Sequence, residues 1–210
     1  MNEELKNILI KVGNLYVRYG IKSVTMDDVS RELGISKKTL YQHVVDKNDL
    51  VSKVVDMLIE DSKNSLDCLF NKELNAIEQL FEVHKHVMVK LKEYSPVSDY
   101  DLRKYYPDEY RKLHHIRREK MYDYMLCNLR KGKEEGLYRK ELDEEILAKI
   151  HVSRIQNTFD SDLLTNEEKT SAKVFYEFFI YHIRGIASEY GIRLLEEKLE
   201  KKELQSSYNQ

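Results

Sequence analysis

Apolar residues recur at spacings of three and four along most of the chain, which is the pattern of amphipathic helices. The first run of this kind spans residues 5–19 and ends at Gly20. Further runs predict helices over 47–70, 74–94, 107–133, 143–159 and 165–189, with a short segment around 100–106 and a charged helix after Gly191. Glycine and proline interrupt helices, and the 210 residues include 7 glycines and 2 prolines. The pattern therefore predicts an all-α fold.

Capping residues stand at the expected starts of several helices. Thr25 is followed three residues later by Asp28, and Thr165 by Glu168, as in capping boxes. Asp46 and Asp143 precede two of the longer helices, and Pro107 suits the first turn of another. Pro96 is expected to stop the helix over 74–94, whereas Gly34 and Gly136 mark the ends of two others.

Two short helices near the N-terminus form the pattern that carries most information. Thr25 caps the first and Ser36 the second, and the link between them is Gly34-Ile35-Ser36. The residues expected to face inward are Val29, Leu33, Ile35, Leu40 and Val44. Those left to face outward on the second helix are Lys37, Lys38, Thr39, Tyr41, Gln42 and His43. This is the pattern of a DNA-binding helix-turn-helix, whose second helix enters the major groove.

Lysines at helix N-termini support DNA binding over mere packing. Lys37 and Lys38 lie in the first turn of the second short helix, and Lys47 in the first turn of the next. The helix dipole is positive there and disfavours cations unless an anion is bound. Phosphates satisfy both the lysines and the free backbone amides. The alternative is a solvated, charged face on a pair of helices that only pack.

The run GIKSVT, DDVSRELGIS, KKTLYQHV, DK resembles the DNA-binding domain of the TetR family of bacterial transcriptional regulators over residues 5–58. The resemblance implies a DNA-binding domain over 1–46, a connecting helix over 47–70, and a helical effector-binding and dimerisation domain over 71–205. It implies phosphate contacts by Thr39, Tyr41 and Lys47. It places Lys37, Lys38, Gln42 and His43 near base edges or adjacent phosphates, and Ser36 completes the DNA-binding set. The sequence departs from the family at Gly13, usually alanine, and at Val44, more often phenylalanine.

The family dimerises through its last two long helices, which the resemblance assigns to about 143–159 and 166–189. The segment VFYEFFIYHI in the second of these is apolar on nearly every side. A helix that faces both its own core and a partner has this composition. The alternative is a central core helix in a monomer.

Net charge and the absence of targeting signals in the sequence bear on how the protein binds DNA and where it is located. The net charge is −2 and the isoelectric point is near 6.4, so DNA binding requires a local basic surface. The N-terminus lacks the pattern of a signal peptide, and no run approaches 18 apolar residues, so we expect a soluble cytoplasmic protein with no membrane partner. Cys68 and Cys127 are far apart and are expected to be free, half-buried thiols.

Catalytic and metal-binding patterns are missing from the sequence. No E-x-x-H, H-E-x-x-H, phosphate-binding glycine motif or nucleophile motif occurs, so we expect no enzyme activity, no metal and no cofactor. Eight of the fifteen tyrosines fall between Tyr94 and Tyr138, a region that also contains methionines. Such side chains suit the wall of an effector pocket, although each is also a candidate core residue. The candidate wall residues are His84, Met88, Tyr110, Met121, Tyr124 and Met125.

The sequence thus predicts a dimeric, sequence-specific regulator, which we expect to be a repressor released from a palindromic DNA operator by a small-molecule effector. The alternative is a helical ligand-binding protein or an enzyme whose helix-turn-helix is only structural.

Overall fold

The computed structural model describes residues 3–70, 73–160, 162–165 and 167–200. For residues 63–70, 156 and 158–160 it describes the backbone alone. The chain divides into two compact units. One contains the residues up to Ser65 and Glu93–Arg118, and the other contains Leu66–Lys92 and the residues from Glu119 onward.

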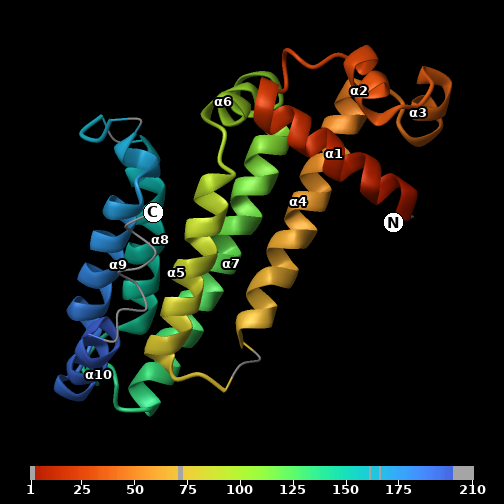
Figure 1. Ribbon diagram of the computed structural model, residues 1–210. Coiled ribbons are helices and arrows are strands. Elements are labelled where there is room, and N and C mark those ends of the chain that lie inside the picture. Colours follow the sequence, from red (N-terminus) through yellow and green to blue (C-terminus); the bar gives the residue numbers. More distant parts are fainter. Residues whose placement is uncertain (1–2, 71–72, 161, 166, 201–210) are drawn as a thin grey trace. The chain divides into compact units, whose positions relative to one another are not determined.

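The first unit contains the N-terminal helices and one segment from the middle of the chain (Figure 1). Its elements are α1 (Glu3–Tyr19), α2 (Met26–Leu33), α3 (Lys37–His43), most of α4 (Lys47–Phe70), α6 (Pro96–Tyr105) and the first part of α7 (Pro107–Glu134). In this unit α6 lies against the C-terminal end of α1, where the Ser98 hydroxyl donates to the carbonyl of Tyr16. This contact fixes α6 beside the turn that leads into α2.

The second unit contains the remaining helices. Its elements are α5 (Ala76–Lys92), the rest of α7, α8 (Glu144–Asp160), a 3-10 turn (Glu168–Thr170), α9 (Ala172–Ile186) and α10 (Glu189–Glu200). After α7, Tyr138 forms an isolated antiparallel bridge with Ala187. The bridge joins the segment after α7 to the end of α9.

The predicted caps form as expected. The Thr25 hydroxyl accepts from the amide of Asp28 at 3.2 Å, and the Asp28 carboxylate accepts from the amide of Thr25 at 3.0 Å. Asp46 accepts from the amide of Asp49 at 2.9 Å, and Asp143 caps α8 through the amide of Ile146 at 2.9 Å. These bonds satisfy amides that have no partner within their own helix.

Three sequence expectations about helix ends are wrong. Pro96 does stop the preceding helix, but it is also the first residue of α6, which spans Pro96–Tyr105 rather than 100–106. The capping box of Thr165 and Glu168 forms, yet it opens the 3-10 turn, and α9 begins only at Ala172 and ends at Ile186. Gly191 lies inside the first turn of α10, not before it.

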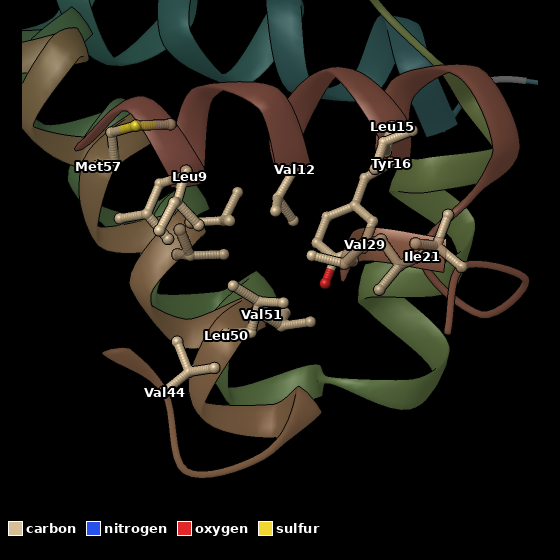
Figure 2. Close-up of a cluster of buried hydrophobic side chains, with 14 of the residues drawn as sticks. Leu9, Val12, Leu15, Tyr16, Ile21, Val29, Val44, Leu50, Val51 and Met57 are labelled. Carbon is tan, nitrogen blue, oxygen red and sulfur yellow. The ribbon is translucent and has the colours of Figure 1, made fainter. Parts of the chain in front are cut away.

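The core of the first unit is mostly aliphatic, with Tyr16 of α1 as an aromatic member (Figure 2). Leu9 and Val12 of α1 meet Val29 of α2 and Leu50 and Val51 of α4, and all five are at most 1% exposed. Burying such side chains contributes about 1.5 to 3 kcal/mol each. The helix-turn-helix is thereby fixed to both its neighbours.

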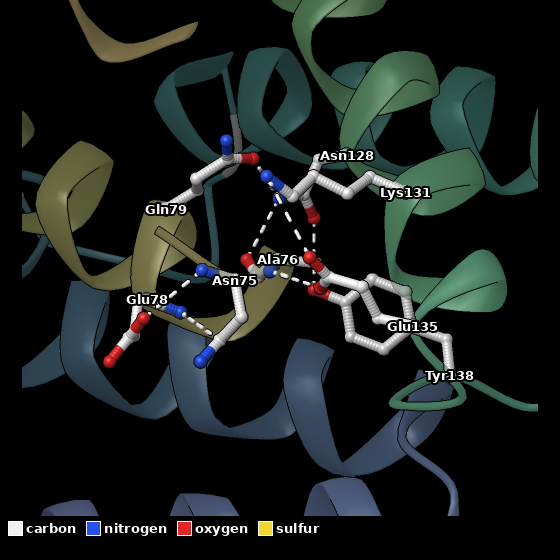
Figure 3. A network of polar contacts seen from close by, with 8 residues as sticks. All are labelled: Asn75, Ala76, Glu78, Gln79, Asn128, Lys131, Glu135 and Tyr138. Atoms are coloured by element: carbon white, nitrogen blue, oxygen red, sulfur yellow. Dashed lines mark hydrogen bonds and ion pairs between the residues drawn. The ribbon is translucent and has the colours of Figure 1, made fainter. Parts of the chain in front are cut away.

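The core of the second unit combines apolar and polar groups (Figure 3). The buried Asn128 amide donates to the carbonyl of Ala76 at 2.8 Å and to Gln79 at 3.3 Å. Its carbonyl accepts from the Tyr138 hydroxyl at 2.9 Å. These bonds tie the start of α5 to α7 and the segment after it.

Residues 93–118, which fall within the predicted effector-binding and dimerisation segment, belong to the first compact unit. Within the described ranges, no helix is long and apolar enough to cross a membrane. Cys127 is a free thiol and is exposed rather than half-buried, while the side chain of Cys68 lies outside the described residues.

Candidate nucleic-acid interface

The turn of the helix-turn-helix requires its glycine. Gly34 has φ 68° and ψ 28°, the left-handed conformation that side chains disfavour. Its amide donates to the carbonyl of Arg31 at 3.2 Å, and the amide of Ile35 donates to the carbonyl of Ser30 at 3.1 Å. These bonds end α2 and set the direction in which α3 leaves.

Helix α3 is held by the buried Leu40, by the buried Val44 at its end and by one cap at its start. Leu40 is fully buried, and Val44, which ends the helix, is 2% exposed. The Ser36 hydroxyl accepts from the amide of Thr39 at 3.0 Å. As predicted, Val29, Leu40 and Val44 face the core, and Leu33 and Ile35 are partly buried against it. The helix therefore presents one fixed face outward.

Most of the predicted DNA-binding side chains lie on that face. The exposed members are Ser36, Lys37, Lys38, Tyr41 and Gln42. Thr39 is half-buried, and its hydroxyl lies 2.8 Å from that of Ser36. Side chains at the start of an exposed helix can reach base edges and phosphates when the helix enters a groove.

His43 departs from the expectation of an exposed side chain. Its side chain is 17% exposed, and its Nε2 lies 3.7 Å from a carboxylate oxygen of Glu4 in α1. Residues at the end of α3 pack against α1, whereas those at its start project away from the core. The side chain of His43 is thus mostly covered by protein, and its contact with DNA stays a prediction.

The two carboxylates at the start of α2 have different partners. Asp27 forms an ion pair with Lys37, although both side chains are more than half exposed. Asp28 accepts from Thr25 and lies 3.5 Å from Arg31, and these hydrogen bonds lower the pKa of its carboxyl. An exposed ion pair is weak, so Lys37 can exchange Asp27 for a phosphate at small cost. The sequence pattern did not indicate this pairing.

Lys47 lies at the start of α4, close to the turn between α1 and α2. Its ammonium donates to the carbonyl of Lys22 at 3.2 Å. Burial and then the charge of Lys22 hold its pKa below the usual range, while Asp101 and Asp28 act in the opposite direction. The side chain is half-buried and therefore positioned, not freely mobile.

The candidate effector residues fall in both units. Tyr110 belongs to the first unit, where its ring lies 4.0 Å from that of His114. The other five belong to the second unit: His84, Tyr124 and Met125 are buried, and Met88 and Met121 are partly buried. His84 stacks on Phe179 of α9, with ring centroids 4.5 Å apart, and burial lowers its pKa to about 4. His84 is therefore neutral at physiological pH.

Helices α8 and α9 carry both aromatic contacts and exposed apolar side chains. The guanidinium of Arg154 lies 4.7 Å from the ring centroid of Phe178 and 4.8 Å from that of Tyr181. Ile146 and Ile150 are about half exposed, and Tyr181 is 66% exposed. The side chain of Phe159, at the predicted end of α8, lies outside the described residues.

In the part of the chain that the structure describes, no group of three His, Cys, Asp or Glu side chains is arranged to hold a metal ion. The geometry of the helix-turn-helix is thus the feature with the clearest chemical use, because its exposed groups are the donors that bind phosphates and base edges.

Comparisons with known proteins agree with this geometry. Residues 14–54 match the family model of the bacterial regulatory proteins of the tetR family. The uncharacterized HTH-type transcriptional regulator YvaF of Bacillus subtilis (strain 168) is 24% identical over 189 residues, which cover 88% of this chain and 96% of that protein.

Solved structures of transcriptional regulators share the fold. The TetR-family regulator from Agrobacterium tumefaciens has a TM-score of 0.67 at 17% identity, covering 88% of this chain and 97% of that one. A regulator from Cytophaga hutchinsonii has a TM-score of 0.73 at 16% identity, with coverages of 89% and 100%. A regulator from Saccharomonospora viridis in complex with choline has a TM-score of 0.70 at 18% identity, with coverages of 90% and 100%. These matches confirm the predicted all-α architecture with an N-terminal helix-turn-helix.

Proposed function

We propose that this protein is a DNA-binding transcriptional regulator of the TetR family, a cytoplasmic dimeric repressor that a small-molecule effector releases from a palindromic operator. The match of residues 14–54 to the family model and the similarity to YvaF support this proposal. The observation that carries the DNA-binding part is the outward face of α3. Lys37, Lys38, Tyr41 and Gln42 are exposed there on a helix that the fully buried Leu40 fixes in place. Because this helix is already ordered, it can enter a DNA groove with little further loss of conformational entropy.

Selection of bound sequences from randomised duplexes tests sequence recognition. The affinity for the selected operator is then measured over a range of salt concentrations. We expect selective binding with a steep salt dependence, because phosphate contacts release counterions. Gln42→Ala should change base preference, whereas Lys47→Ala should weaken binding to all duplexes alike and reduce the salt slope by about 1 per contact. Equal affinity of the wild-type protein for every duplex at physiological salt would contradict the proposal.

The proposed dimer uses α8 and α9. The exposed apolar residues Ile146, Ile150 and Tyr181 support this choice, because a face of this kind is favourable when a partner covers it. Two-fold symmetry also suits a palindromic operator. Sedimentation equilibrium should give a dimer that Tyr181→Glu weakens, while Tyr190→Glu, at a 54% exposed position on α10, leaves it intact. A wild-type monomer at all concentrations would refute the dimer.

The proposed effector site lies among α5, α9 and the second part of α7. The support is chemical: the neutral His84 stacks on Phe179, and Tyr124 and Met125 are buried in the same unit. Such groups suit a partly apolar ligand with a polar group. A thermal-shift screen of hydrophobic metabolites, drugs and choline, which the Saccharomonospora viridis regulator binds, identifies ligands.

Each ligand is then tested for its effect on operator affinity. Release from DNA requires that the effector bind the DNA-free arrangement more tightly than the DNA-bound one. We expect a true effector to weaken operator binding at saturation. A ligand that stabilises the protein and leaves operator affinity unchanged would show that it is not an effector.

A further inference from the structure

Three lysines that are distant in the sequence meet beside the turn between α1 and α2. The ammonium of Lys47, in α4, donates to the carbonyl of Lys22 at 3.2 Å. The ammonium of Lys22 lies 4.7 Å from the ring centroid of Tyr105, and that of Lys104 lies 5.4 Å from the same centroid. The tyrosine ring at the end of α6 thus attracts two cations from two segments.

This arrangement is held by buried contacts and does not depend on the lysine side chains themselves. The amide of Lys22 donates to the carboxylate of Asp101 at 2.7 Å, and Asp101 is 6% exposed. At Gly20, where φ is 81°, an added Cβ would lie 2.8 Å from Val97 Cγ1 and 2.9 Å from Asp101 Oδ2. The turn and α6 therefore approach closely, so the backbone positions that carry their lysines are fixed relative to each other.

The local charge is positive. Lys22 and Lys104 are exposed, and one oxygen of Asp101 is already engaged by a backbone amide. Asp28 acts on Lys47 from α2, but its carboxylate is bound to Thr25 and lies 3.5 Å from Arg31. The charge of Lys22 contributes to the lowered pKa of Lys47, so these cations repel each other in the free protein. An anion between them would remove that repulsion.

We propose that Lys22 and Lys104, with the exposed rings of Tyr100 and Tyr105, form a second DNA contact that binds the phosphate backbone beside the groove entered by α3. We call these four residues the turn–α6 surface. It is continuous with Lys47, the residue at the start of α4 for which the family resemblance implies a phosphate contact. The inference rests on the proposed DNA-binding function and extends its footprint from the helix-turn-helix to α6.

The chemistry of the turn–α6 surface suits a phosphate backbone. The Tyr100 hydroxyl accepts from the ammonium of Lys104 at 2.9 Å, which leaves its own proton available to donate to a phosphate oxygen. Lysine and tyrosine donors are common phosphate contacts and carry no base information. A DNA strand presents a repeating row of phosphate charges, so it can engage more than one lysine of this surface at the same time.

The experiment compares salt slopes of the full-length protein on the selected operator carrying flanking duplex on both sides. Lys104→Gln and Lys22→Gln should each reduce the magnitude of the slope by about 1 per lost phosphate contact, with base preference unchanged. Lys104→Arg retains the charge and should retain the wild-type slope. The matched control is Lys140→Gln, an exposed lysine in the second unit, which should behave as wild type.

A second duplex, trimmed to the selected base pairs, distinguishes the loss of a contact with flanking DNA from a folding defect in the variants. On it the wild-type slope should fall toward that of the glutamine variants, and thermal melting of all variants should match the wild type. Wild-type slopes for both glutamine variants on the long duplex would overturn the inference and leave the proposed function standing. Absence of selective binding by the wild-type protein would instead overturn the proposed function itself.

Discussion

The two units of this protein are stabilised in different ways. The first is built on aliphatic contacts such as those of Leu9, Leu40 and Leu50, each essentially fully buried. The second places Asn128 and His84 in its core and joins Phe81 to Phe179 edge to face at 4.9 Å. Aliphatic packing tolerates rearrangement of shape, whereas buried polar groups need each partner in place. The DNA-binding unit should therefore respond mainly to lost volume, and the second unit to lost hydrogen bonds and to protonation.

The largest expected effect is the loss of volume at the contact that fixes α3. Leu40→Ala should lower the free energy of unfolding of the first unit by about 2 to 5 kcal/mol, because the buried side chain leaves a cavity. Urea denaturation followed by circular dichroism measures this loss. Val45→Ala is the control, since Val45 is 80% exposed and should change stability by less than about 0.5 kcal/mol. Similar losses for both variants would contradict the packing described for α3.

The matching test in the second unit removes a hydrogen-bonding group without removing volume. Asn128→Leu should cost about 3 kcal/mol, because it leaves the carbonyl of Ala76 and the hydroxyl of Tyr138 buried without this partner. Adding Tyr138→Phe removes the tyrosine hydroxyl, one of the two groups that the first substitution leaves buried without a hydrogen-bond partner. The double variant should therefore be more stable than the sum of the two single losses predicts. Additive losses would show that the two side chains do not act together.

Acidification should destabilise the second unit. Burial lowers the pKa of His84 to about 4, and burial together with Arg154 lowers that of His151 to about 4, against about 6.5 in an unfolded chain. Between these values the unfolded chain binds more protons, so stability falls as the pH falls from about 6.5 to 4 and is constant below. Each histidine should cost about 2 kcal/mol at pH 5 relative to pH 7.5.

The variant His84→Phe isolates one of these contributions. Phenylalanine keeps a ring beside Phe179 and has no proton to bind. The difference in unfolding free energy between pH 7.5 and pH 5 should become smaller by about 2 kcal/mol in this variant. An unchanged difference would mean that His84 does not carry the pH dependence.

The smallest expected effect is a stabilisation of the first unit. Gly13 lies within α1, and an added Cβ would meet Val54 Cγ1 at 3.9 Å, an ordinary contact. Gly13→Ala should therefore raise the free energy of unfolding by about 0.4 to 1 kcal/mol, because alanine loses less backbone freedom on folding. Thermal melting should detect the gain, and a loss of stability would indicate that α1 and α4 pack more tightly than described. The family's usual alanine thus fits this site.

The sequence alone determined the features that depend on neighbours three or four residues apart. The capping box of Thr25 and Asp28, the turn at Gly34 and the cap at Ser36 are all local, and each formed as predicted. Periodicity also located the long helices, because burial of one face repeats with the helix turn. Together these local signals were sufficient to identify the DNA-binding domain.

Tertiary structure decided everything that depends on residues far apart in the chain. Glu4 of α1 covers part of His43, and the second unit joins Asn128 to Ala76, 52 residues away. Lys104 meets Lys22 at the ring of Tyr105 because Asp101 holds the turn against α6. Such contacts arise from the packing of separate helices, whose relative placement is not encoded in the period of any one of them.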